Sequence, residues 1–203
     1  MRLGWSHGDQ EIFTKEELVN YFSLDHVGKK GSIFDLEKLQ WLNGVYLRTL
    51  PLPDLFQHMR AMNTELMESL LKMWSHDQLE LLVEHYRQRV TSLKDLCNDI
   101  LSFAQRPQKL DLSMIEKWKT AHTKTMLAAF ADNMKALTCF DHAELLALAQ
   151  EIITPRGEKL VTMAQPLRLA LTGSVQSPSV FDLMGILGKE KSLSRIRSLI
   201  EVL

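Results

Sequence analysis

The chain has 203 residues, of which 45% are hydrophobic and 24% are charged, so it has the composition of an ordinary globular protein with room for a sizeable core. No apolar run approaches the roughly 20 residues of a membrane-spanning helix, and the first residues lack the apolar segment of a signal peptide. Because the net charge is only −1, nucleic-acid binding cannot be inferred from the bulk charge and would have to come from local patches.

Helical signals dominate the first quarter of the chain. Thr14 and Glu17 form a capping box, which predicts the start of a first helix. Asp35 predicts the start of a second helix, which we expect to end near the Asn43-Gly44 pair. The prolines at positions 51 and 53 predict a boundary followed by the first turn of another helix.

The middle of the chain is also helical. A capping box at Ser75 and Gln78 opens a helix that contains Tyr86, and a shorter helix is expected over about 93–103. Ser113 and Glu116 predict the start of one long helix that continues to about residue 137. Another helix is expected over about 141–153.

The segment 165–196 predicts three further helices. The first ends at Gly173, Pro178 opens the second, and Gly188 separates the second from the third. From residue 156 onward seven basic residues stand against four acidic ones, a weak local excess of positive charge that a solvated helix face could carry.

These signals predict an all-α fold of about ten helices, because no alternating segment is long enough for a confident strand. Breaks near 51–53 and 107–112 divide the chain into three units, over residues 1–52, 53–112 and 113–203. We expect Phe34 and Trp41 to belong to the core rather than to serve as stacking platforms.

Motifs of an independent enzyme are absent from the sequence. It contains no phosphate-binding loop of the Walker type and no GxGxxG, and its seven histidines show no metal-ligand spacing. The GKKGS stretch at 28–32 is too short for a phosphate loop and predicts a solvated turn, with a contact to an RNA backbone as the alternative. The cysteines Cys97 and Cys139 predict buried apolar roles and no disulfide, as suits a reducing cytoplasm.

Four separated stretches, in the same order, resemble the bacterial glutamyl-tRNA synthetases. They are LGWSHGDQEIFTKEEL (3–18), FSLDHVGKKGSIFDLEKLQWLNGVYLR (22–48), YRQRVTSLKDL (86–96) and QPLRLALTGSVQSPSVFDLMGILGKEKSLSRI (165–196). Together they cover nearly the whole chain. The resemblance implies that residues 1–52 are the end of the domain that contacts the tRNA stem. It also implies that residues 53–112 and 113–203 are two helical anticodon-binding subdomains.

The resemblance also implies what the chain lacks. The HIGH-like and KMSKS-like motifs of the family's catalytic domain are not in this sequence, so we expect a C-terminal piece that is inactive by itself. ATP and magnesium would belong to the catalytic domain, and no cofactor is expected here. The expected partner is the tRNA for glutamate, without DNA or membrane binding, and the expected state is a cytoplasmic monomer.

By the same resemblance, five residues are expected to contact the anticodon. Arg89 stands where discriminating members of the family carry an arginine that recognises the third anticodon base, with a surface arginine at a helix end as the alternative. Arg87, two residues away, is expected to contact the RNA backbone. Arg168, Ser177 and Val180 match residues of the anticodon loop contact, with ordinary helix–loop packing as the alternative.

Five further residues are expected to approach the tRNA stem or backbone, positioning the RNA without selecting its sequence: Asn43, Tyr46, Arg48, Lys189 and Lys191. Two other functions remain open from the residues alone. One is a helical protein–protein adaptor, which the near-neutral net charge favours. The other is a free-standing enzyme, because a helical bundle can assemble a site from distant residues.

Overall fold

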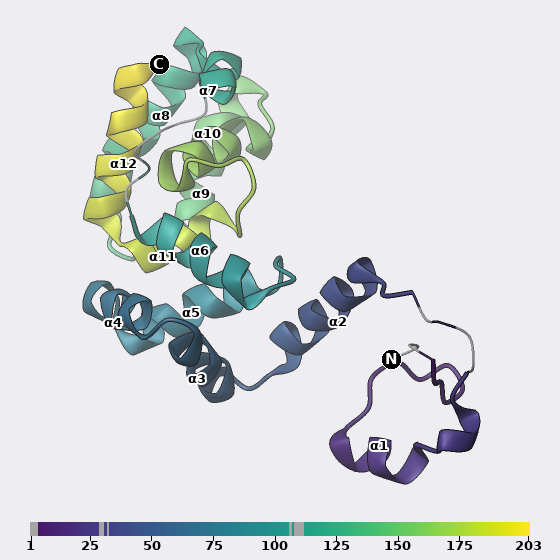
Figure 1. The fold of residues 1–203 in the computed structure, drawn as a ribbon. Helices are drawn as coiled ribbons and strands as arrows, with labels where there is room; N and C mark the ends of the chain where they lie inside the picture. Colours follow the sequence, from purple (N-terminus) through teal and green to yellow (C-terminus); the bar gives the residue numbers. More distant parts are fainter. Residues whose placement is uncertain (1–3, 29–30, 32, 106, 108–111) are drawn as a thin grey trace.

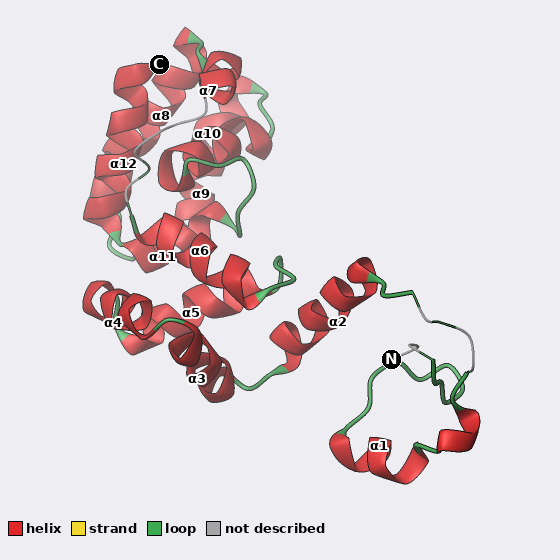
Figure 2. Cartoon of the chain, in the orientation of Figure 1, coloured by secondary structure: helices red, strands yellow, loops and turns green. Residues whose placement is uncertain are grey.

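The computed structural model describes residues 4–28, 31, 33–105, 107 and 112–203, and of residues 112–114 it describes the backbone alone. The described part of the chain is helical without a β-strand, and one isolated bridge joins His7 to Gln10. This confirms the all-α prediction (Figure 2). In chain order the elements are α1 (Lys15–Tyr21), η1 (Leu24–His26), α2 (Leu36–Thr49), α3 (Leu52–Met62), α4 (Thr64–Met73), α5 (His76–Arg87), α6 (Leu93–Ala104), α7 (Leu112–Trp118), α8 (Ala121–Asn133), η2 (Met134–Ala136), α9 (His142–Ile153), η3 (Thr154–Arg156), α10 (Leu160–Thr172), α11 (Val180–Leu187) and α12 (Lys189–Val202).

Most helix ends follow the predicted capping chemistry. Both capping boxes form, at Thr14 before α1 and at Ser75 before α5, each with reciprocal bonds between side chain and backbone. Gly173 ends α10 with φ of 70°, and Gly188 separates α11 from α12 with φ of 84°. Helix α11 begins at Val180, two residues after the proline that was expected to open it.

Three helix boundaries differ from the sequence prediction. Helix α2 continues through Gly44 to Thr49, because Gly44 does not adopt the left-handed conformation with which a glycine ends a helix, and Pro51 disfavours helical backbone only at Leu50. The prediction of one long helix from Ser113 to about residue 137 is wrong. Helix α7 already begins at Leu112 and ends at Trp118, and the Thr120 side chain then caps α8.

A helix that the sequence analysis did not separate, α4, follows α3 almost directly. The Asn63 side chain accepts a hydrogen bond from the Leu66 backbone N–H at 2.9 Å, which ends α3 and caps α4 in one residue. The described residues therefore hold twelve α-helices where about ten were expected.

Two groups of helices form most of the molecule (Figure 1). Helices α3 to α6 pack on one another, and α8 to α12 pack on one another. The groups meet where α11 contacts α5 and α10 contacts α6. One continuous cluster of buried residues, from Leu47 to Leu199, runs through both groups, so they share a core. The division into units over 1–52, 53–112 and 113–203 stays a prediction.

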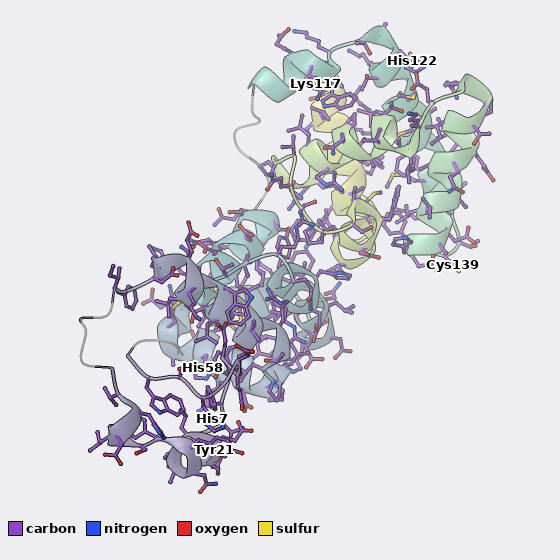
Figure 3. The ribbon with its side chains drawn as sticks, turned by 90° about the vertical axis from the view of Figure 1, so that its right-hand side faces the viewer. His7, Tyr21, His58, Lys117, His122 and Cys139 are labelled. Atoms are coloured by element: carbon purple, nitrogen blue, oxygen red, sulfur yellow. The ribbon has the colours of Figure 1, made fainter. Side chains whose placement is uncertain are left out.

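The N-terminal part lies apart from these two groups, and α2 extends from it to them (Figure 1). Its small core centres on Trp5 and Phe13, whose rings lie 5.5 Å apart, and His7 stacks on Tyr21 at 4.4 Å (Figure 3). Phe34 and Trp41 are 58% and 44% exposed, so the expectation that they belong to the core is wrong. Helix α2 packs on α5, and Figure 1 shows no other described helix lying over its outer face.

Arg195 of α12 joins the two groups through a buried guanidinium. It donates hydrogen bonds to the carbonyl of Leu171, near the end of α10, and to the carbonyl of Ala104, the last residue of α6. Carbonyls in the last turn of a helix have no partner within the helix, and a cation there also complements the helix dipole. The guanidinium carbon lies 5.4 Å from the centre of the Phe103 ring, at a cation–π distance.

No helix of the described chain is both long and apolar enough to span a membrane. The turn predicted at 28–32 falls mostly outside the described residues, since positions 29, 30 and 32 are among those not described.

We expect Arg195→Met to lower the free energy of unfolding by about 2–4 kcal/mol, because it leaves the buried Leu171 carbonyl and the part-buried Ala104 carbonyl without this donor. Urea unfolding followed by circular dichroism measures this. Arg197→Met, on the exposed side of the same helix, is the matched control and should change the value by less than about 0.5 kcal/mol. Equal midpoints for the two variants would contradict the role of Arg195.

Candidate nucleic-acid interface

A polar cavity of about 510 Å³ lies where the two helical groups meet. It is bounded by the C-terminal end of α5, by α6 and by the loop between α10 and α11, which is one of the loops shown in green in Figure 2. The lining residues are Tyr86, Gln88, Arg89, Asp99, Ser174, Gln176, Ser177 and Pro178. The cavity thus brings together Arg89 and Ser177, which are 88 positions apart in the chain and were both predicted from the sequence.

Arg89 stands just past the end of α5, with its backbone N–H bonded to the Tyr86 carbonyl at 3.0 Å. The side chain is exposed, and within the described part of the chain its guanidinium has no hydrogen bond or ion pair. A cation at a helix C-terminus is stabilised by the helix dipole. The five donors of Arg89 therefore lie at the cavity and remain open to a ligand.

Arg168, on α10, is tied to the loop that forms the opposite wall. Its Nε donates a hydrogen bond to Ser177 Oγ at 3.0 Å, and Ser177 Oγ donates in turn to the Pro178 carbonyl at 2.9 Å. Burial, and then the positive charge of Arg89, lower the pKa of Arg168. The two arginines are thus close enough to repel each other, and an electronegative ligand between them would relieve that repulsion.

The loop from Gly173 to Ser179 is held by its own hydroxyl groups. Thr172 Oγ accepts from the Ser174 backbone N–H at 3.2 Å, and Ser174 Oγ accepts from the Gln176 N–H at 3.1 Å. Short side chains of this kind commonly stabilise turns by bonding to nearby backbone. Ser177 is itself buried, so its hydroxyl mainly orients Arg168 and the loop.

The cavity also holds polar residues that the sequence analysis missed. Asp99 of α6 and Tyr86 of α5 lie on its wall with Gln88, Ser174 and Gln176. Burial raises the pKa of Tyr86, and the nearby Asp99 charge raises it further, so the tyrosine hydroxyl is a neutral donor. The one sequence signal for this wall is that Asp95 and Asp99 stand one turn apart on α6, where like charges repel.

Val180, expected at the anticodon contact, is 2% exposed and packs in the core. Arg87 is engaged within the protein, since it forms an ion pair with Glu84 and donates to the Leu50 carbonyl at 2.8 Å. For Val180 this favours the packing alternative, and for Arg87 it favours a structural role over the expected contact with the RNA backbone. Arg87 ties the end of α5 to the residue that ends α2.

The two lysines expected at the RNA backbone also have partners in the protein. Lys189 donates to the carbonyls of Lys135 and Leu137, at 3.1 and 2.6 Å. Lys191 lies 4.8 Å from the centre of the Trp74 ring and remains exposed. Lys191 is therefore the more accessible of the two charges.

The predicted stem contacts lie on α2, away from the main cavity. Asn43 and Tyr46 line a second, mostly apolar pocket of about 300 Å³, together with residues of α3 and α6 such as Leu55 and Leu93. Arg48 lies partly exposed alongside Gly44. Across the described residues no group of three or more potential metal ligands was found.

A helical scaffold that presents an open arginine fork in a polar cavity has the character of a binding module. Comparison with known proteins identifies the family to which this module belongs. The family model described as the anticodon binding domain matches residues 55–200. This chain belongs to that family of anticodon-binding domains.

The most similar relatives include glutamate–tRNA ligases. The enzyme of Thermodesulfovibrio yellowstonii is 36% identical over 208 residues, which cover 98% of this chain and 43% of that protein. A glutamate–tRNA ligase of Campylobacter hominis is 33% identical over 99% of this chain and 42% of that protein. The chain thus spans about two fifths of the length of the relatives it matches.

A solved structure gives the same result. A glutamate tRNA ligase from Elizabethkingia meningosepticum, in complex with its amino acid, superposes with a TM-score of 0.88 at 27% identity, over 100% of this chain and 39% of that one. The resemblance to glutamyl-tRNA synthetases is therefore confirmed, and these comparisons give no support to a protein–protein adaptor.

The burial of Val180 yields a test of its role. Val180→Ala should lower the free energy of unfolding by about 1.5–3 kcal/mol through lost packing, while the affinity of the folded chain for an anticodon stem-loop stays within twofold. Chemical unfolding and a fluorescence titration measure the two quantities. A large loss of affinity with unchanged stability would instead indicate contact with a base.

Proposed function

We propose that this chain is the tRNA-binding portion of a glutamyl-tRNA synthetase and that it binds the anticodon loop of the glutamate tRNA. The observation that carries the proposal is the cavity between the two helical groups, with the open fork of Arg89 on one wall and Arg168 behind the opposite loop. Residues 53–112 and 113–203 would then each supply one wall of a single site. Family membership over residues 55–200 supports the same function.

The chemistry of the cavity suits an unstacked base. Single-stranded loops are recognised through base edges, and a guanidinium offers two parallel donors to a pair of acceptors on such an edge. A volume of about 510 Å³ accommodates a base, and the polar lining supplies further hydrogen-bond partners. Arg89 is the residue we propose for the third anticodon base, as in the discriminating type of synthetase.

The remaining parts of the chain would position the tRNA. We propose that Asn43, Tyr46 and Arg48 on α2 approach the inner stem, where contacts to phosphate and sugar fix orientation without selecting sequence. Lys191 would add attraction to the backbone. ATP and magnesium would be needed only by a catalytic domain, so we propose that the chain alone, a cytoplasmic monomer, binds tRNA without activating glutamate.

Substitutions at Arg89 test this proposal. We expect Arg89→Ala to weaken binding of glutamate tRNA by roughly 1–3 kcal/mol and to reduce the preference at the third anticodon base. Arg89→Lys should keep the attraction of the charge but lose most of that preference, because an ammonium has no planar fork. Filter binding with variants of the third base, at several salt concentrations, measures both effects.

Arg87→Ala is the matched control, two residues away. Its side chain bonds to Glu84 and Leu50, so its loss should affect stability more than base preference. Since Arg89 is proposed to contact a base, the slope of log affinity against log salt should change little in Arg89→Ala. An unchanged base preference in Arg89→Ala would refute the assignment of Arg89, and no salt-dependent tRNA binding by the wild-type chain would refute the function.

A further inference from the structure

The cavity at the junction of the helical groups contains a carboxylate that the proposed function leaves unused. Of the described residues that line it, Asp99 is the one acid. It lies on α6, across from the loop that carries Ser174 and Gln176, and shares the cavity with Arg89. Within the described part of the chain its carboxylate accepts no hydrogen bond, and its side chain is exposed to the open cavity.

The surroundings of Asp99 connect it to Arg89. Burial and the neighbouring charge of Asp95 raise the pKa of Asp99, while Arg89 lowers it. Asp99 in turn contributes to the raised pKa of Tyr86 on the cavity wall. Asp99 and Arg89 form no ion pair within 4 Å. The carboxylate acceptor and the guanidinium donors therefore both remain available in the same cavity.

An arginine fork alone is an ambiguous partner for a base. Its two donors match the O2 and N3 acceptors of cytosine, and they also match the O6 and N7 acceptors of guanine. The third anticodon base pairs with the first codon base, so it is cytosine in glutamate tRNAs and guanine in glutamine tRNAs. A second group is therefore needed to favour cytosine over guanine.

We propose that Asp99 is a specificity-determining residue, whose carboxylate accepts a hydrogen bond from the exocyclic amino group of the base that Arg89 contacts. Carboxylates are natural partners of cytosine N4, and the amino group lies on the same edge as the two acceptors. Arg89 and Asp99 together complement three adjacent groups of cytosine. This inference rests on the proposed function and adds a second residue to its site.

The test removes only the exocyclic amino group of the third anticodon base. An anticodon stem-loop of glutamate tRNA is prepared with cytosine, or with pyrimidin-2-one, at the third anticodon position. Pyrimidin-2-one keeps O2 and N3 but lacks N4. The 203-residue chain should bind the cytosine form about tenfold more tightly, as expected for one hydrogen bond to a charged acceptor. In Asp99→Ala the two forms should bind within twofold of each other, and Asp99→Asn, which keeps a neutral acceptor, should fall between.

Asp95→Ala is the matched control, because it removes the same charge one turn away on α6, outside the cavity lining. It should keep the tenfold ratio. A tenfold ratio retained in Asp99→Ala, a ratio near one in the wild type, or an equal loss in Asp95→Ala would each overturn the role of Asp99. If the wild-type chain bound neither stem-loop, the proposed function itself would fail. Binding that depends on Arg89 but not on Asp99 would leave the function standing and reject only this inference.

Discussion

The buried guanidinium of Arg195 is the interaction on which the candidate site depends. Reaching in from α12, it bonds to the last residue of α6 and to the final turn of α10, and it lies against the Phe103 ring. One side chain thus supplies donors to a buried carbonyl near the end of α10 and to a part-buried carbonyl at the end of α6. Gln78 adds a second tie across the same junction, since its side chain donates to the Ile186 carbonyl at 3.0 Å.

Fixing α6 against α10 has a direct consequence for the cavity. The α6 wall carries Asp99, and the end of α10 leads into the loop that carries Ser177. Arg168 is held to that loop through Ser177 Oγ, and the charge of Arg89 contributes to lowering the pKa of Arg168. A site assembled from two helical groups needs a rigid joint between them, because a shift of about an ångström misplaces hydrogen-bond partners.

The sequence predicted local structure better than it predicted contacts. Capping boxes and glycine stops are local signals, so the ends of α1, α5 and α10 were predictable. The break at Thr120 was missed because a threonine cap within a helical pattern looks like an ordinary helix residue. Trp41 was assigned to a core because apolar spacing cannot say whether another element covers that helix face.

The candidate site, too, could be predicted only in part from the sequence. Resemblance to the family drew attention to Arg89, Arg168 and Ser177, which the structure brings to one junction. The resemblance could not distinguish a side chain that is open to a ligand from one that is hydrogen-bonded within the protein, as Arg87 and Lys189 are. Asp99 was missed because its significance comes only from tertiary packing, which sets a surface acid of α6 beside an arginine ten positions earlier.

The central claim is that RNA binds at the junction of the two helical groups. Hydrogen–deuterium exchange of the chain, with and without a saturating anticodon stem-loop of glutamate tRNA, tests it most directly. The account predicts slower exchange of backbone amides at residues 86–92 and 173–179, and little change when an unrelated stem-loop is used. Protection confined to other surfaces, such as α3 and α4, with unchanged exchange at both of these segments, would contradict it.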